Sequence, residues 1–261
     1  MNWLQSECVI LKEKPFKEKD RLVTFLAKDK GRLTGIAKSA KVLTGRGVGA
    51  FEPFTRGTIH YLEKSGSDLV TIRKCDPTPP FLMLHHNYEQ FLFASYFTEL
   101  VVLCPISPAD APVFYDLLTH GLDRLAAGDE DFRVVRLRFE MDFLTCLGVQ
   151  PRWGRCAQCG KTLYQKSGGG YRLLQGAPHK FDLKRGVLCP ACPGHGSGVF
   201  VVSPQVMEFV GVWLDPHQTD SGPPMAGVLA QLEAVVSAQV MAHLERVPRS
   251  MALLPDPADI L

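Results

Sequence analysis

Short apolar runs with little helical periodicity fill the first 75 positions of the chain, and this pattern predicts β-strands. The runs are rich in β-branched and aromatic residues and are separated by turn-forming segments such as 28–31 and 64–68. The expected strands are 8–16, 20–30, 31–38, 53–64 and 67–75. Five strands in so short a segment favour a small closed barrel over a sandwich, which usually has more strands. The expected fold of this segment is therefore a five-stranded OB-fold barrel.

The hydrophobic period changes after the proline-rich segment 75–81, which ends the strand pattern. Apolar residues then recur at spacings of three and four, as on one face of a helix. The expected helices are 85–104, one that begins at 107–110 and runs past Leu125, 129–148, 203–214 and 223–247. Acidic residues in the first turn and Gly148 at the end favour the third of these helices in particular.

The fold class is thus α+β and multidomain, with a helical domain that carries a cysteine-rich insert. The expected divisions are an OB-fold domain (1–79), two parts of a helical domain (80–150 and 201–250), the insert (151–200) and a poorly ordered tail (251–261).

The insert contains two Cys-x-x-Cys pairs, and 29 residues separate them. Two such pairs can supply four thiolates to one tetrahedral Zn²⁺, and Gly160 suits the tight turn after the first pair. We therefore expect one structural Zn²⁺ with the ligands Cys156, Cys159, Cys189 and Cys192.

Other roles for these cysteines fit the pattern less well. A thioredoxin-type redox pair needs a βαβ context, which the sequence lacks. His179 or His195 could replace one thiolate, and His195, three residues after the last cysteine, is the better substitute. A catalytic zinc needs an open position and a nearby base, but the insert has a single acidic residue, Asp182.

The chain carries a formal net charge of +2, which conceals a strong segregation of charge. Residues 1–80 hold 15 Lys/Arg and 9 Asp/Glu, and residues 151–200 hold 8 and 1. The segments 81–150 and 201–261 are acidic. Two basic blocks separated by acidic ones suit a polyanionic partner, although solvated surfaces would give the same composition.

No Walker loop, GxGxxG, GxSxG or HExxH motif occurs, so we expect a protein that is not an enzyme. No apolar run reaches the roughly 18–20 residues of a membrane helix. The charged N-terminus is unlike a secretory signal, and eight cysteines fit a reducing compartment. The expected location is cytoplasmic, without membrane contact.

Residues 35–57 form a basic, glycine-containing connection between the third and fourth expected strands. Together with cations on neighbouring turns, this loop would create a positive groove for single-stranded nucleic acid. Phe51 and Phe54 are available for base stacking, or belong to the core, and the loop could also simply increase solubility. The expected DNA-binding residues are Lys28, Lys30, Arg32, Lys38, Lys41, Arg46 and Arg56.

Several stretches, in order, resemble the bacterial recombination mediator family RecO over nearly the whole chain. They are the basic loop GIAKSAKVLTGRGVGAFEPFTRG, the helix and first cysteine pair RFEMDFLTCLGVQPRWGRCAQCG, the second pair GVLCPAC, and the C-terminal LERVPRSMALL. The long glycine-rich ribbon between the cysteine pairs departs from the family pattern.

The resemblance implies a protein that binds single- and double-stranded DNA and anneals complementary strands. It further implies a partnership with RecR, and in many bacteria RecF, in loading RecA onto DNA coated with single-strand-binding protein. The acidic C-terminal tail of that coating protein would contact the helical domain, where Arg136 and Arg138 are possible contacts. Two other classes remain open: a zinc-ribbon transcription regulator and a metal-dependent nuclease.

Overall fold

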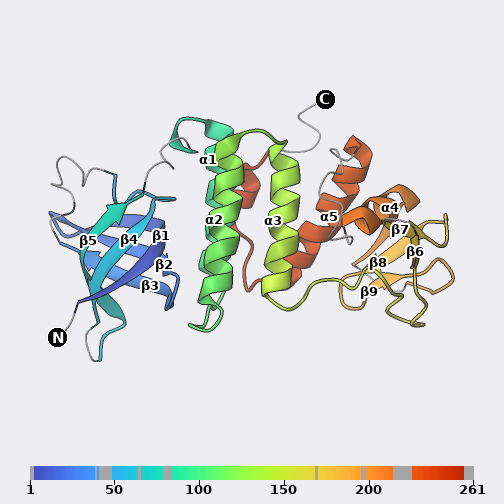
Figure 1. Cartoon of the computed structure of the whole chain (residues 1–261), viewed down its shortest axis with the longest axis horizontal. Coiled ribbons are helices and arrows are strands. Elements are labelled where there is room, and N and C mark those ends of the chain that lie inside the picture. Colours follow the sequence, from blue (N-terminus) through green and yellow to red (C-terminus); the bar gives the residue numbers. More distant parts are fainter. Residues whose placement is uncertain are drawn as a thin grey trace. The chain divides into compact units, whose positions relative to one another are not determined.

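The computed structural model of the chain describes residues 3–38, 40, 49–63, 66–78, 84–167, 170–194, 198–213 and 225–255 (Figure 1). It divides into two compact units. Unit 1 comprises Met1–Phe139 with Glu245–Asp256, and unit 2 comprises Glu140–Leu244 with Pro257–Leu261.

Unit 1 begins with a closed five-stranded barrel, which confirms the expected OB-like architecture (Figure 1). Its strands are β1 (Leu4–Phe16), β2 (Asp20–Ala27), β3 (Gly31–Ala37), β4 (Arg56–Leu62) and β5 (Leu69–Pro77). They follow the order β1-β2-β3-β5-β4, with β3 and β5 parallel and the other pairs antiparallel. Inward-facing residues such as Ile10, Phe25 and Ile59 are fully buried and form the barrel core.

One glycine on β3 leaves space for side chains of the parallel strand β5. A Cβ at Gly35 on β3 would lie 2.6 Å from Val70 Cγ2 and 2.8 Å from Ile72 Cγ1 on β5. Any larger residue would therefore displace the Val70 and Ile72 side chains from their places in the barrel.

Two complete helices and part of a third follow in unit 1. Helix α1 (Tyr88–Leu103) is capped by the Asn87 carboxamide, and α2 (Ala111–Ala127) ends at Gly128 with φ 69°. In their core, Phe97 of α1 stacks on Phe139 of α3 (Phe132–Cys146), with ring centroids 3.9 Å apart. Gly121 of α2 makes room for this stack.

A short 3-10 helix, Arg249–Leu253, returns the chain to unit 1. The Glu99 carboxylate on α1 accepts hydrogen bonds from the Ser250 backbone N–H at 2.8 Å and from its hydroxyl at 2.6 Å. Burial raises the pKa of Glu99, but these bonds and the neighbouring Arg246 act more strongly and lower it.

The third helix begins at Phe132, later than the expected start at 129. The acids expected in its first turn precede it instead, and the Asp131 carboxylate accepts a hydrogen bond from the Arg133 backbone N–H at 2.8 Å. Glu130 forms ion pairs with Arg124 and Arg138.

Unit 2 contains the cysteine-rich insert and the last two long helices. Strands β6 (Tyr164–Ser167) and β7 (Gly170–Leu173) form a hairpin. Strands β8 (His179–Asp182), β9 (Gly186–Leu188) and β10 (Val199–Val202) form a sheet with the order β10-β8-β9. The helices are α4 (Pro204–Trp213) and α5 (Ala226–Ala242).

The interior of unit 2 combines aromatic packing with buried carboxylates, among them that of Glu140. Trp153 packs against Phe181 of β8 with ring centroids 5.2 Å apart, and both side chains are buried. Glu140, which is fully buried, accepts a hydrogen bond from the Ser237 hydroxyl of α5 at 2.9 Å. Across the described ranges of both units, no helix has the length and apolarity to cross a membrane.

Candidate functional site

The four expected metal ligands converge in unit 2. Their sulfur atoms lie within 4.8 Å of one another, and Cys159 Sγ is 3.8 Å from Cys189 Sγ. A tetrahedral shell with metal–sulfur bonds of about 2.3 Å separates its sulfurs by about 3.8 Å. The geometry therefore fits one metal ion held by four thiolates.

Two backbone turns position the cysteines. The Gly160 N–H donates to the Cys156 carbonyl at 3.0 Å, and the Cys192 N–H donates to the Cys189 carbonyl at 3.0 Å. Gly160 has φ 73°, which confirms the expected left-handed turn. The Cys189 N–H also donates to the Cys156 sulfur at 3.3 Å, as in a metal knuckle that stabilises thiolate.

The pKa values of two of the four thiols are shifted in opposite directions. Burial raises the pKa of Cys156, but backbone N–H groups oppose this effect and lower it to about 6. Hydrogen bonding to Cys189 and burial raise the pKa of Cys192 to about 12. Four close thiols cannot all ionise beside one another unless a metal ion balances their charge.

Histidine does not join the four sulfurs in the part of unit 2 that the structure describes. The His179 side chain is fully buried, and its Nδ1 lies 2.9 Å from the Ala177 carbonyl oxygen. The other histidine considered as a ligand, His195, lies outside the described residues.

Three of the expected DNA-binding cations contact helices of unit 1. Lys28 pairs with Glu7 at 3.0 Å and with Asp116 of α2 at 3.8 Å. The hydrogen bond with Glu7 raises the pKa of Lys28. Arg56 pairs with Asp123 of α2 at 3.3 Å.

Arg32 donates from Nη1 to the carbonyl oxygens of Val102 and Cys104 at the end of α1. Lys28, Arg32 and Arg56 therefore lie where the barrel meets α1 and α2.

The remaining expected residues lie away from these helix contacts. Lys30 lies just before β3 and pairs with Glu63 at 3.8 Å, and the exposed Lys38 lies just after β3. Seven residues of strand separate the two ends by about 20 Å. Lys41 and Arg46 lie outside the described residues.

The aromatic residues available for base stacking differ from those first considered. Phe51 and Phe54 are 6% and 1% exposed, so they belong to the interior. Trp3, which is 46% exposed, has the Arg73 guanidinium 5.5 Å from its ring centroid. The sequence did not predict this pair, because Trp3, just before β1, and Arg73 of β5 are distant along the chain.

The two arginines suggested for protein contacts on α3 have other contacts. Arg136 is 9% exposed, and its guanidinium lies 5.2 Å from the Tyr96 ring centroid. Arg138 pairs with Glu130 at 3.1 Å.

Comparison with known proteins identifies the chain's relatives. The family model "Recombination protein O N terminal" matches residues 1–81, and "Recombination protein O C terminal" matches residues 85–252. The DNA repair protein RecO of Desulforudis audaxviator is 29% identical over 97% of both chains. The DNA repair protein RecO of Anaeromyxobacter sp. is 32% identical over 71% of this chain and 69% of its own length. The chain therefore belongs to the RecO family of DNA repair proteins.

Proposed function

We propose that this protein is a recombination mediator in DNA repair. It binds single- and double-stranded DNA, anneals complementary strands, and acts with RecR to help load RecA onto DNA coated with single-strand-binding protein. RecF and the acidic C-terminal tail of the coating protein are further partners. Its place of action is the nucleoid in the cytoplasm.

Membership of the RecO family carries this proposal, and the closed barrel with its basic residues supports it. Barrels of this kind bind single strands along one face, by neutralising phosphates and stacking bases. Annealing itself requires no bond chemistry. A basic surface that neutralises the phosphates of two strands lowers their mutual repulsion, so that the bases can pair.

The DNA-binding residues we propose on the barrel are the seven cations identified from the sequence. Lys28 and Arg56 are paired with carboxylates on α2, but their side chains remain 40% and 35% exposed. Exposed ion pairs contribute only about 0–1 kcal/mol, so a phosphate can replace such a carboxylate.

The metal we propose is a single structural Zn²⁺. Four thiolates and no carboxylate among the described ligands favour a soft or borderline metal in a closed shell. The ion would hold the two knuckles together, and the bound thiolates would leave no position open for a substrate.

Annealing of two complementary labelled oligonucleotides by the purified, zinc-loaded protein tests the proposed function. We expect annealing to be faster than the spontaneous reaction, to weaken steeply with salt, and to leave both strands intact. Cleavage of the strands on addition of Mg²⁺ would instead indicate a nuclease. Binding that depends strongly on base sequence would indicate a transcription regulator.

A substitution series locates the DNA surface. Replacing Lys38, Lys41 and Arg46 together with Ala should weaken DNA binding and flatten its salt dependence while the fold is kept. Unchanged affinity in an anisotropy titration would remove these residues from the proposed surface.

A further inference from the structure

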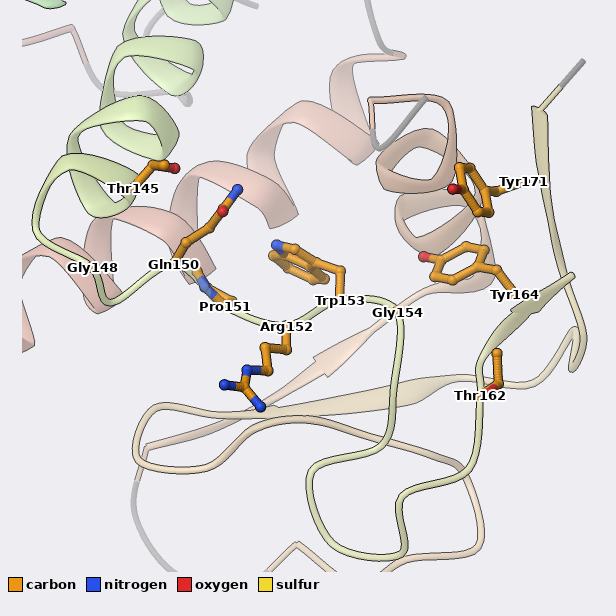
Figure 2. A pocket seen from close by; sticks show the side chains of 10 residues that line it. All are labelled: Thr145, Gly148, Gln150, Pro151, Arg152, Trp153, Gly154, Thr162, Tyr164 and Tyr171. Atoms are coloured by element: carbon orange, nitrogen blue, oxygen red, sulfur yellow. The ribbon is translucent and has the colours of Figure 1, made fainter. Parts of the chain in front are cut away.

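Unit 2 contains an aromatic cavity of about 560 Å³ between the end of α3 and the β6–β7 hairpin (Figure 2). Its volume lies in the range of small-ligand sites, roughly 300–1,000 Å³. Its wall includes Trp153, Tyr164 and Tyr171, and Figure 2 shows both tyrosine rings on the hairpin side, opposite the end of α3. Tyr164 is 5% exposed and Tyr171 is 36% exposed, so Tyr171 offers the accessible ring.

A buried donor in the cavity wall has no partner. The Trp153 side chain is 1% exposed, and its Nε1–H makes no hydrogen bond within the described residues. Tyr164, in contrast, already donates to the Met207 carbonyl at 2.6 Å. An indole N–H that lacks a partner is rare in a protein interior, and a ligand that presents an acceptor would satisfy it.

A second cavity, of about 540 Å³, adjoins the first. The two share Gln150, Pro151 and Arg152 in their walls. Figure 2 shows the Arg152 guanidinium and the Trp153 ring pointing away from each other on this shared segment.

The second cavity is strongly basic. Its wall contains the cations Arg152, Arg155, Lys184 and Arg185. Arg185 pairs with Asp182, the one acidic residue of the insert, at 2.8 Å. Arg152, Arg155 and Lys184 are exposed and form no ion pair among the residues that the structure describes. This excess of positive charge favours a phosphate.

We propose that unit 2 binds one unpaired nucleotide of a single-stranded DNA, with the base in the aromatic cavity and its phosphate in the basic cavity. A single sugar joins a base to its phosphate, so two cavities with a common wall can take both from one nucleotide. The base stacks on Tyr171, and the buried Trp153 ring shifts so that its Nε1 donates a hydrogen bond to the base. The phosphate lies against Arg152 and Arg155.

This site rests on the proposed DNA-binding function and adds that unit 2 binds an unpaired strand in preference to a duplex. A base inside a duplex is stacked and paired, and it cannot enter a cavity without leaving the helix. The site therefore retains a strand before annealing and loses its hold once that strand has paired. It also assigns a role to the glycine-rich ribbon between the cysteine pairs, which presents Tyr171.

Two oligonucleotides with identical phosphates test the proposal. One is a labelled oligo-dT of about 16 nucleotides, and the other has the same length but abasic sites in place of its bases. We expect the full-length, zinc-loaded wild type to bind oligo-dT more tightly than the abasic strand. Tyr171→Ala should weaken oligo-dT binding about tenfold, the effect of losing one stacked base, and leave abasic binding nearly unchanged.

Two further variants separate the base from the phosphate. Trp153→Phe keeps a ring but removes the donor, and it should weaken oligo-dT binding roughly fivefold with little effect on the abasic strand. Arg155→Ala should weaken the binding of both oligonucleotides. It should also make the slope of log affinity against log salt shallower by about 0.7.

Matched controls are Tyr88→Ala, an exposed tyrosine of unit 1, and Arg172→Ala, an exposed arginine of the hairpin that lines neither cavity. Both should bind like the wild type, and zinc content and thermal melting confirm that each variant is folded. The proposal is overturned if Tyr171→Ala loses as much affinity for the abasic strand as for oligo-dT, or if it loses no affinity for either. Failure of the wild type to bind either strand would instead refute the proposed function.

Discussion

Asp123→Asn should increase the affinity of the barrel for DNA. Asp123 Oδ2 lies 3.3 Å from Arg56 Nη1, and the two side chains are 53% and 35% exposed. At this distance the attraction between unit charges in water is roughly 1 kcal/mol, in line with the 0–1 kcal/mol measured for exposed pairs. A phosphate bound at Arg56 must displace this carboxylate. Its removal should therefore tighten binding by up to roughly fivefold.

Anisotropy titrations of labelled DNA at about 50 mM and about 200 mM salt measure this effect, which should shrink at the higher salt. Asp129→Asn is the matched control, because it changes the net charge equally and Asp129 lies beyond the end of α2. An equal gain in both variants would show that total charge, and not the Arg56 pair, controls affinity. No gain in Asp123→Asn would place Arg56 away from the bound DNA.

Three further predictions concern the metal and the stability of each unit. Chelation of the metal, or Cys159→Ala, should abolish zinc binding and expose residues 151–200 to protease, whereas the barrel should still bind DNA; a protease-resistant insert would contradict the structural role. Gly121→Ala should destabilise unit 1 by about 1–3 kcal/mol in thermal melts, because the new Cβ would lie 2.6 Å from a stacked phenylalanine ring. Gly227→Ala on α5, where a Cβ meets nothing within 4 Å, should be neutral or stabilising. Glu99→Gln should cost about 1–2 kcal/mol at neutral pH, since charged acceptors make the stronger hydrogen bonds to Ser250. The folded pKa of Glu99 is lowered, so its stabilisation is full above the unfolded pKa of about 4.3 and disappears as the pH falls through the folded value. A constant difference between wild type and Glu99→Gln down to the acid limit would contradict this linkage.

The elements of the fold could be predicted because each depends on a local pattern. β-branched and aromatic runs between turn segments predicted all five barrel strands, and apolar runs with helical spacing or capping residues predicted the helices. The error at the start of α3 came from a competing side-chain interaction. Asp131 binds the backbone of Arg133 from outside the helix, and a sequence pattern does not distinguish this position from a first helical turn.

The cluster of four cysteines could also be predicted, since the spacing within each Cys-x-x-Cys pair already determines a turn that brings two sulfurs together. The ion-pair partners of the basic residues could not be predicted. Lys28 and Arg56 appeared as free cations in a basic block, but their partners Asp116 and Asp123 lie on a helix far along the chain. Long-range pairing of this kind leaves no local signal.

The sequence by itself determined the barrel, the helices and the four-thiolate cluster, because local backbone preferences and short ligand spacings specify them. Only the tertiary structure decided which aromatic and basic groups meet. Trp153 and Tyr171 line one cavity because the hairpin lies across the cavity from the end of α3. Their roles depend on exposure and on an unsatisfied donor, and both are properties of packing between segments that are separate in the sequence.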